Sequence, residues 1–448
     1  MNSSVTKLPA AAQALQAKID AREACVGIVG LGYVGLPLAG AFNDAGFPVL
    51  GFDVDQHKVD FLERGENYLK HLGDEFTRKL ADSDLFQATS DPKRLADADA
   101  ILLCVPTPLG AHSEPDLSYV LDSTRLVAKV LRAGQLVVLE STTYPGTTRD
   151  EMLPILEAGG LRCGTDFFAA YSPEREDPGR AGMTTSTIPK LVGGIDEISG
   201  DLAMALYEKV ITQMHRVPSA EVAEAAKLLE NIYRAVNIAL VNELKVVLTQ
   251  MNVDVWEVVK AASTKPFGFQ AFYPGPGLGG HCIPIDPFYL TWKAKEIGHH
   301  TKFIELAGEI NSGMPHYVVD RVAGALNDEK KALRGSKVFV IGIAYKPDID
   351  DIRESPAAEI VELLQSAGAD VSYHDPHVPS FPSMRHYQIA LDSVALDATN
   401  LKAADCVLIV TDHNAIDYDL IGQHAGLVVD TRNAMTRTNA PQARIVKA

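Results

Sequence analysis

The chain has 448 residues with 41 Lys and Arg against 58 Asp and Glu, so its formal net charge is −17. Hydrophobic residues make up 46% and charged residues 22%, which is typical of a globular protein, suggests about three domains and excludes collagen or wholesale disorder. Such an acidic chain is a poor partner for nucleic acid, because phosphate contacts need clustered Lys and Arg.

Residues 1–24 predict a lead-in helix. They lack the basic start and long apolar stretch of a signal peptide, and no apolar run elsewhere approaches the roughly 18 residues that a membrane span needs. Five cysteines without a CxxC pair argue against a disulfide framework. We therefore expect a cytoplasmic protein without a membrane partner.

Residues 25–55 have the pattern of a strand, a helix and a second strand. CVGIVG is a β-branched apolar run, PLAGAFNDAG is helical, and PVLGFDVD is again apolar. Four further apolar strands follow at 98–108, 134–142, 167–174 and 188–194. Strands that alternate with helices predict a parallel sheet, so we expect a Rossmann-like domain over 25–217.

The motif GxGxxG occupies residues 30–35, between the first strand and the first helix of this domain. Gly30 permits the tight turn, Gly32 lets a pyrophosphate approach the backbone, and Gly35 allows close packing of helix on strand. Tyr33 and Val34 complete the loop. Asp53 follows at the end of the second strand, where its carboxylate can bind ribose hydroxyls and repel a 2′-phosphate. The pattern predicts a site for NAD rather than NADP.

Polar residues also follow two later strands of the same sheet. Pro106 and Thr107 come after the strand at 98–108, and Thr142 ends the strand at 134–142. Ligands of open parallel sheets bind at such carboxyl ends, so we expect these residues to contact the cofactor or a water. For Thr107, an ordinary loop hydroxyl is the alternative.

A long helix is predicted after residue 218, with Ser219 as its N-cap. The helical spacing of its apolar residues indicates a broad stripe that bridges domains or forms a dimer seam. The residues of this stripe are Val222, Ala225, Ala226, Leu229, Ile232 and Val236. Lys227 and Asn231 share one face of the helix and could form an oxyanion clamp; a solvated stripe is the alternative. A second helix is predicted at 254–264.

The Gly- and Pro-rich segment 265–287 predicts a functional loop. It contains Cys282 in the sequence GGHCIPID, where the adjacent glycines leave the thiol accessible. A dehydrogenase with such a cysteine suggests aldehyde oxidation through a thiohemiacetal and a thioester. A zinc site or a structural cysteine are the alternatives, but His281 and Cys282 have no CxxC partner, and we expect no metal. The other cysteines, in or near apolar strands, are expected to be inert: Cys25, Cys104, Cys163 and Cys406.

A second strand, helix, strand unit covers 336–345, 355–368 and 369–376, and further strands are predicted at 405–413 and 426–433. The predicted fold is therefore α/β. Two Rossmann-like parallel-sheet domains, 25–217 and 333–448, are joined by a central helical domain at 218–332 that holds the long helix and the cysteine loop.

Five motifs in this order resemble those of the nucleotide-sugar 6-dehydrogenases, the UDP-glucose dehydrogenase superfamily. They are GLGYVGLP at 30–37, YSPERE at 171–176, AEAAKLLENIYRAVNIALVNE at 223–243, PGPGLGGHCIPIDP at 274–287 and YKPDIDDIRES at 345–355. The similarity spans nearly the whole chain and is strongest to the UDP-N-acetylglucosamine 6-dehydrogenases of surface-polysaccharide synthesis. It implies a homodimer or higher homo-oligomer that oxidises the sugar 6-hydroxyl of a UDP-sugar to a carboxylate with two NAD.

The resemblance also implies roles for individual residues. Cys282 is the nucleophile, Lys227 and Asn231 stabilise negative charge on the substrate oxygen, and Asp286 with Thr142 positions a water. Glu174 acts as a base. Asp53, Lys58 and Arg353 bind the cofactor. The residues implied to bind the UDP-sugar, besides Glu174, Lys227 and Asn231, are Arg175, Phe272, Tyr273, Gly277, Gly279, Tyr345, Lys346 and Arg432.

Departures from the family pattern bear on the sugar. UDP-glucose enzymes usually have Lys at the position of Ile285 and Phe at the position of Arg175, so the N-acetylhexosamine branch is favoured; UDP-N-acetylmannosamine enzymes commonly have a smaller residue than Pro284. UDP-N-acetylmannosamine and UDP-glucose remain alternatives. A two-domain 3-hydroxyacid dehydrogenase is a further alternative, although it would leave 333–448 unexplained. The non-enzyme alternative is a catalytically silent regulator that binds NAD or a UDP-sugar.

Overall fold

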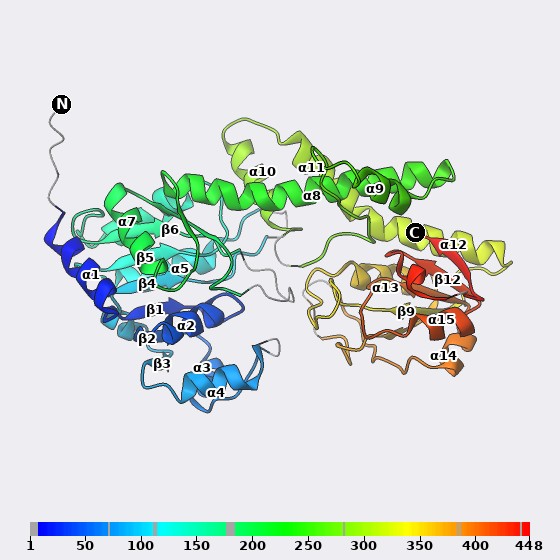
Figure 1. The fold of residues 1–448 in the computed structure, drawn as a ribbon, viewed down its shortest axis with the longest axis horizontal. Helices are drawn as coiled ribbons and strands as arrows, with labels where there is room; N and C mark the ends of the chain where they lie inside the picture. The colour runs from blue at the N-terminus through cyan, green and yellow to red at the C-terminus, as the bar shows by residue number, and fades with distance from the viewer. Residues whose placement is uncertain are drawn as a thin grey trace. The chain divides into compact units, whose positions relative to one another are not determined.

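The computed structural model describes residues 8–69, 72–110, 114–175, 184–280, 283–382, 384, 387–439 and 441–448. The chain forms two compact units, Met1–Glu230 and Asn231–Ala448, here called unit 1 and unit 2 (Figure 1). Each contains its own sheet. The predicted class, two Rossmann-like parallel-sheet folds and a central helical region with one long helix, is confirmed.

Unit 1 is built on an eight-stranded sheet of order β3-β2-β1-β4-β5-β6-β7-β8. Most strands are four residues long and fully buried, as expected for a parallel sheet that is covered on both faces. The strands in chain order are β1 (Val26–Val29), β2 (Val49–Phe52), β3 (Phe86–Thr89), β4 (Ala100–Leu103), β5 (Leu136–Leu139), β6 (Phe168–Tyr171), β7 (Lys190–Gly194) and β8 (Met214–Arg216).

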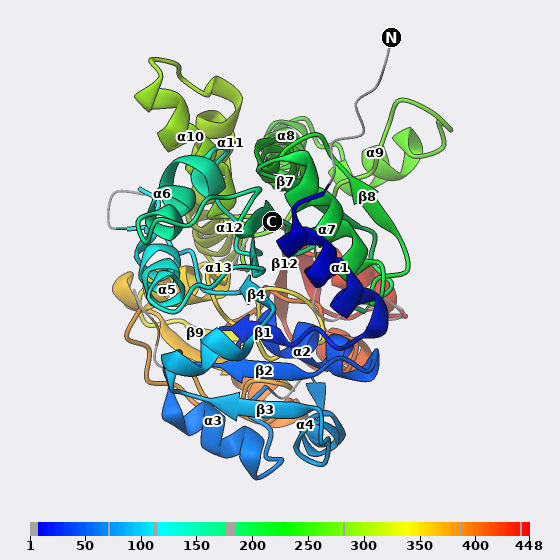
Figure 2. The ribbon, with the colours of Figure 1, turned by 90° about the vertical axis from the view of Figure 1, so that its left-hand side faces the viewer.

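Helices cover both faces of this sheet (Figure 2). One core contains apolar residues of α1 (Ala10–Ala21), α2 (Gly35–Asp44) and α7 (Glu197–Tyr207), and the other contains those of α5 (Ser118–Ala128) and α6 (Leu153–Glu157). The lead-in helix predicted for residues 1–24 is α1, whose Ala12, Leu15 and Ile19 are buried. Shorter elements are α3 (Gln56–Glu63), α4 (Asp74–Ala81), η2 (Pro92–Asp97) and η3 (Thr147–Met152).

The sheet of unit 1 is not wholly parallel, contrary to the prediction. β6 and β7 pair antiparallel, through Ala170 with Gly194 and Tyr171 with Gly193. A parallel return needs a crossover, usually a helix, and no helix is described between these two strands. Two strands at the sheet edges, β3 and β8, were also not predicted, because each is short and incompletely buried and therefore lacks an apolar run.

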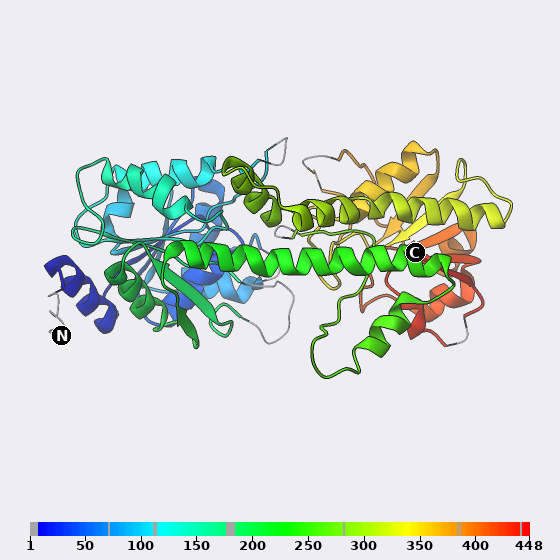
Figure 3. The same ribbon diagram turned by 90° about the horizontal axis from the view of Figure 1, so that it is seen from above.

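The predicted long helix is α8 (Ala220–Gln250), which is continuous over 31 residues (Figure 3). Ser219 caps it as predicted, since its Oγ accepts from Val222 N at 3.4 Å. The predicted apolar stripe is partly exposed within the chain, with Val222 45% and Leu229 65% exposed. Its part in a domain bridge or a dimer seam stays a prediction. Many positions on the buried face are polar, and hydrophobic spacing could not identify them. They are Glu224, Lys227, Asn231, Asn242 and Lys245.

Unit 2 is built on a five-stranded parallel sheet of order β10-β9-β11-β12-β13. α12 and α13 contribute to one core and α14 and α15 to the other. The strands are β9 (Lys337–Ile341), β10 (Asp370–His374), β11 (Cys406–Ile409), β12 (Leu427–Asp430) and β13 (Arg444–Lys447). The helices, besides α8, are α9 (Val255–Ala262), α10 (Asp286–Glu296), α11 (Lys302–Ser312), α12 (Met314–Asp328), α13 (Pro356–Ser366), α14 (Ala398–Ala403), α15 (Tyr418–His424) and η4 (Ala434–Arg437).

Candidate functional site

The glycine-rich loop between β1 and α2 has the geometry of a dinucleotide-binding loop. Gly30 has φ +94°, and a Cβ on it would lie 2.5 Å from the Cys104 carbonyl oxygen. A Cβ on Gly35 would lie 1.8 Å from the Gly30 carbonyl oxygen, so both positions require glycine. No atom lies within 4 Å of a Cβ built on Gly32, which leaves room for a pyrophosphate beside the N-terminus of α2.

Asp53 holds the same loop from the end of β2. It is buried, and its Oδ2 accepts from Leu31 N at 2.9 Å and from Lys58 Nζ at 2.9 Å. Its Oδ1 accepts from Asp55 N at 3.0 Å. Tyr33 is 40% exposed. The structure thus brings together the predicted cofactor residues Gly30, Gly32, Tyr33, Val34, Gly35, Asp53 and Lys58, and they fit an adenosine ribose and a pyrophosphate.

We expect Asp53→Asn to raise the KM for NAD about tenfold or more, because it replaces a charged acceptor of ribose hydroxyls by a neutral one. The matched control is Asp55→Asn. Asp55 instead caps α3, through His57 N at 3.0 Å. Initial rates against NAD concentration check the prediction, together with a melting curve because Asp53 also supports Leu31. An equal KM in the two variants would contradict it.

The carboxyl ends of β4, β5 and β6 lie at one edge of the sheet, because these strands are parallel neighbours. Ser141 ties two of them together: its Oγ accepts from Val105 N at 3.0 Å and donates to Val105 O at 2.6 Å. Thr107 is buried in this edge, Pro106 is exposed and Thr142 is half-buried. Glu174 N donates to Glu140 O at 3.4 Å. The predicted residues at the strand ends therefore share one edge.

A buried ion pair at this edge was not predicted. Lys190 Nζ lies 2.6 Å from Glu140 Oε2 and donates to Pro173 O at 3.0 Å, while Tyr207 OH donates to the other carboxylate oxygen. Burial lowers the pKa of Lys190, but Glu140 and Glu174 together raise it above its ordinary value. The sequence did hold a signal for this pair: Glu140 and Lys190 are each the single charged residue of an otherwise apolar predicted strand. The pair fixes the segment that leads to Glu174.

Arg175 has its own acidic partner within unit 1. Its guanidinium donates to both carboxylate oxygens of Glu230, at 2.6 and 3.2 Å, and to Pro189 O at 2.7 Å. A bidentate pair of this kind fixes the guanidinium in one orientation. A substrate contact by Arg175 stays a prediction.

The two predicted clamp residues are both buried on α8. Lys227 and Asn231 are each 6% exposed and lie one turn apart. Asn231 Nδ2 donates to Asp286 Oδ2 at 2.6 Å, and Asp286 is the first residue of α10. The alternative of a solvated stripe is therefore wrong for these two positions. Lys227 offers a cation, and the Asn231–Asp286 pair offers an oriented amide and carboxylate.

The loop before α10 packs closely on the first loop of the second sheet. A Cβ on Gly279 would lie 2.5 Å from Tyr345 Cβ, and one on Gly275 would lie 2.5 Å from Arg432 Nη1. Gly280 N donates to Arg353 O at 3.1 Å. Unit 2 therefore brings together the predicted substrate residues Gly277, Gly279, Tyr345 and Arg432, with Lys346 next along the chain. The Arg353 guanidinium is paired with Asp351 at 2.7 Å, and its predicted contact with the cofactor stays a prediction.

The aromatic residues before this loop are placed by two ring contacts. Phe272 meets Tyr233 of α8 edge to face, with ring centroids 5.7 Å apart. Tyr273 stacks on Trp256 of α9 at 5.3 Å and is 51% exposed. Phe272 therefore fixes the loop against α8, while Tyr273 leaves an aromatic face accessible.

Cys282 and His281 lie outside the described residues, so the predicted nucleophile stays a prediction. The other cysteines behave as predicted, because burial raises the pKa of each thiol. The pKa reaches about 11 for Cys25 and Cys163 and about 12 for Cys406. None of these four is a thiolate at neutral pH.

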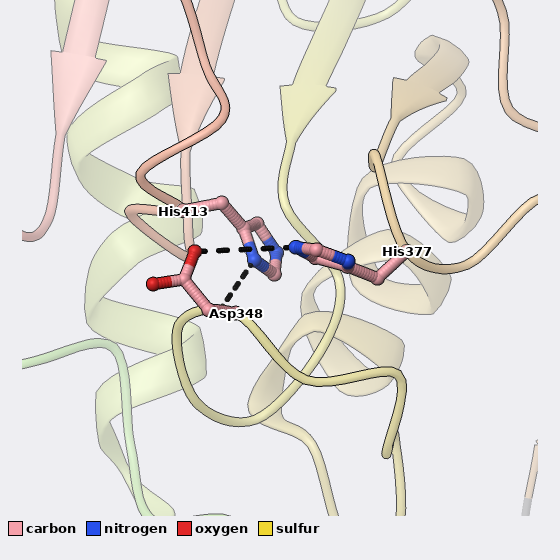
Figure 4. Close-up of side chains that lie close together, drawn as sticks. All are labelled: Asp348, His377 and His413. Carbon is pink, nitrogen blue, oxygen red and sulfur yellow. Dashed lines mark hydrogen bonds and ion pairs between the residues drawn. The ribbon is translucent and has the colours of Figure 1, made fainter. Parts of the chain in front are cut away.

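A cluster of Asp348, His377 and His413 stands at the carboxyl edge of the second sheet (Figure 4). Both nitrogens of His413 are engaged: Nδ1 accepts from Asp348 N at 2.9 Å, and Nε2 pairs with Asp375 Oδ2 at 3.0 Å. His413 has no free lone pair for a metal. Asp375 also accepts from Ile343 N at 2.7 Å and Ala344 N at 3.2 Å. Through Asp375, His413 therefore stabilises the loop that leads to Tyr345.

Comparison with known proteins agrees with this geometry. The sequence matches the UDP-glucose/GDP-mannose dehydrogenase family in its NAD binding domain at 24–211, its central domain at 221–313 and its UDP binding domain at 339–437. Protein CapL of Staphylococcus aureus is 37% identical, over 91% of this chain and 95% of CapL. The chain belongs to the UDP-glucose/GDP-mannose dehydrogenase family. The family resemblance predicted from the motifs is confirmed.

Two further relatives of this nucleotide-sugar dehydrogenase bear on its activity. The UDP-N-acetyl-D-glucosamine 6-dehydrogenase of Pseudomonas aeruginosa is 38% identical over 81% of this chain and 85% of its own length. The structure of the UDP-D-ManNAc dehydrogenase of Pyrococcus horikoshii superposes with a TM-score of 0.84 at 31% identity, over 94% of this chain and 98% of that one. The protein is an NAD-dependent oxidoreductase. The UDP binding domain at 339–437 removes the two-domain 3-hydroxyacid dehydrogenase as an alternative.

Within the described part of the chain, no helix has the length and the apolar character to cross a bilayer.

Proposed function

We propose that the protein is a UDP-N-acetylglucosamine 6-dehydrogenase, which oxidises the sugar 6-hydroxyl to a carboxylate in two two-electron steps. The observation that carries this proposal is the buried cation, amide and carboxylate of Lys227, Asn231 and Asp286, in a chain with NAD binding and UDP binding domains. NAD, held by the loop at residues 30–35, would supply the hydride acceptor for each step, so two NAD would be needed per sugar.

The proposed roles follow from the chemistry of the side chains. Lys227 and the amide of Asn231 stabilise negative charge on the sugar oxygen. The Cys282 thiol adds to the aldehyde to give a thiohemiacetal, which is oxidised to a thioester. Asp286, held by Asn231, orients the water that hydrolyses the thioester. For Thr142 and Glu174 we keep the roles that the family resemblance implies, positioning of a water and action as a base. Tyr345, Lys346 and Arg432 bind the UDP portion.

The choice of sugar is supported by Ile285 and Arg175. A UDP-glucose enzyme of this family usually has Lys at the first position, whereas Ile285 is 8% exposed and apolar. The relative named as a UDP-N-acetyl-D-glucosamine 6-dehydrogenase is 38% identical. UDP-N-acetylmannosamine is the second candidate, because the P. horikoshii enzyme named for that sugar has nearly the same fold.

A panel of UDP-sugars tests the proposal. Purified protein is given NAD with UDP-N-acetylglucosamine, UDP-N-acetylmannosamine or UDP-glucose, and NADH and the acid are followed together. We expect the highest kcat/KM with UDP-N-acetylglucosamine and two NADH per acid. A higher kcat/KM with another sugar would change the assignment. Binding of NAD and UDP, seen as a rise in Tm without turnover of any sugar, would favour the silent regulator.

We also propose that the protein forms a homodimer along α8. Exposed apolar side chains follow one another there at spacings of three, four or seven residues, which is the pattern of a helical seam. They are Tyr233, Leu240, Leu244, Val247 and Met251, between 39% and 64% exposed. Light scattering of the wild type and of Leu240→Asp tests this proposal. A monomeric wild type would contradict it.

A further inference from the structure

A cavity of about 540 Å³ lies in unit 2, next to the loop that carries Tyr273 and Gly275 but lined by other residues. It is formed by the end of α8, the start of α9, the second half of α12 and β13. Its walls carry four cations, Lys245, Arg321, Arg444 and Lys447, and two acids, Asp254 and Asp328. A volume of this order is typical of sites for nucleotide-sized ligands.

The two acids are already paired at the rim. Arg444 lies 2.6 Å from Asp328 and 2.9 Å from Glu329, and Lys447 is paired with Asp254. This leaves Lys245 and Arg321 as the cations of the cavity without a carboxylate partner among the described residues. The side chains left to meet an anionic ligand are therefore Lys245 and Arg321.

Lys245 is 3% exposed, which is rare for a lysine that lacks an acidic partner. Its Nζ donates to Gly275 O at 3.1 Å and lies 5.2 Å from the ring centroid of Tyr317. Burial and the nearby Arg432 and Arg321 lower the pKa of Lys245 to about 7. An anion in the cavity would reverse this effect and favour the ammonium form.

Arg321 carries an unsatisfied donor. Its Nη2 donates to Lys447 O at 3.2 Å, but its Nε is buried without a partner among the described residues. A buried unpaired guanidinium donor is costly, and a ligand oxygen would satisfy it. Trp256 adds an aromatic side chain to the wall.

We propose that this cavity binds a phosphorylated small molecule of nucleotide size, with Lys245 and Arg321 on its phosphate oxygens. The ligand is distinct from the UDP-sugar, whose proposed contacts Tyr345, Lys346 and Arg432 do not line the cavity. The cavity adjoins them at Lys245, which donates to Gly275 O and lies near Arg432, and Gly275 in turn faces Arg432. A ligand here is placed to influence substrate binding.

Inorganic pyrophosphate is the probe for the phosphate contacts, and ATP tests for a nucleotide. We expect both to raise the Tm of the wild type, and Arg321→Gln to weaken the affinity for pyrophosphate about tenfold or more. Arg321→Gln should leave the KM for the UDP-sugar unchanged. Lys331→Gln, at an exposed lysine paired with Asp405 outside the cavity, is the charge control and should bind pyrophosphate like the wild type.

Lys346→Ala separates this site from the proposed substrate site. It should retain the pyrophosphate shift in Tm while it raises the KM for the UDP-sugar. Loss of the shift in Lys346→Ala, or an equal shift in wild type and Arg321→Gln, would overturn the proposal, as would no shift in the wild type. If Arg321→Gln does not fold, Lys245→Met serves the same purpose. The Tm shifts and the affinity for pyrophosphate need no turnover, so failure of the proposed activity would be seen separately.

Discussion

Replacing Cys282 with alanine is expected to lower uronate formation by at least about a thousandfold. Without a thiol, the aldehyde cannot be held as a thiohemiacetal, and no thioester forms for water to hydrolyse. Losses of this order are typical when a covalent nucleophile is removed. Cys282→Ser should lose nearly as much uronate formation, because a serine hydroxyl is hardly ionised at neutral pH. NADH formation and the acid product, measured together with the preferred UDP-sugar, check both variants.

Cys163→Ser is the matched control for this experiment. Cys163 is partly buried, burial raises the pKa of its thiol to about 11, and its Sγ lies 3.8 Å from Asp196 Oδ2. It should retain acid formation near the wild-type rate and still react with the thiol-directed reagent that inactivates the wild type. Normal acid formation by Cys282→Ala would exclude the thioester route while leaving the family assignment intact.

The first unit was the part of the fold most open to prediction. The fingerprint at 30–35 joins three backbone requirements in six residues, and the structure shows each of them at Gly30, Gly32 and Gly35. Asp53 was predictable for the same reason, since its spacing from the motif is set by one helix and one strand. Local geometry determines all of these positions.

The corresponding acid of unit 2 shows what such local reasoning missed. Asp375 follows β10 as Asp53 follows β2, and it accepts from Ile343 N as Asp53 accepts from Leu31 N. The two strand, helix, strand units were recognised as similar, but the second lacks the GxGxxG motif, so Asp375 was not singled out. Its partner His413 follows another strand, β11, and a pairing between such distant segments cannot be found by spacing.

Tertiary contacts also explain which face of α8 is buried within the chain. Glu224 is fully buried because its carboxylate accepts from Gly146 N at 2.6 Å, Thr148 N at 2.9 Å and Thr148 Oγ1 at 2.6 Å. Hydrophobic spacing treats such a residue as solvent-facing. Conversely, the apolar Leu229 is 65% exposed, as expected if a second copy covers this side. Partners from distant segments decide which side of this helix is buried.

Lys190→Met is expected to destabilise unit 1 by about 3–5 kcal/mol, because it leaves the Glu140 carboxylate buried without its cation. For a unit of this size the loss corresponds to a drop in Tm of roughly 10 °C. Glu140 is fully buried, and Tyr207 would be its remaining side-chain donor. Thermal unfolding followed by circular dichroism measures the effect. The double variant Glu140→Gln with Lys190→Met removes the charge as well and should recover most of the loss.

The stability of the single variant Lys190→Met should depend on pH in a defined direction. Burial already raises the pKa of Glu140 in the wild type, and without Lys190 the pKa rises further. The folded protein then binds a proton that the unfolded chain has lost, so stability falls as pH rises above the ordinary carboxyl range. The Tm deficit of Lys190→Met should be larger at pH 8 than at pH 5. The double variant should not show this pH dependence. A deficit that does not change with pH would mean that lost packing, rather than the stranded carboxylate, destabilises the variant.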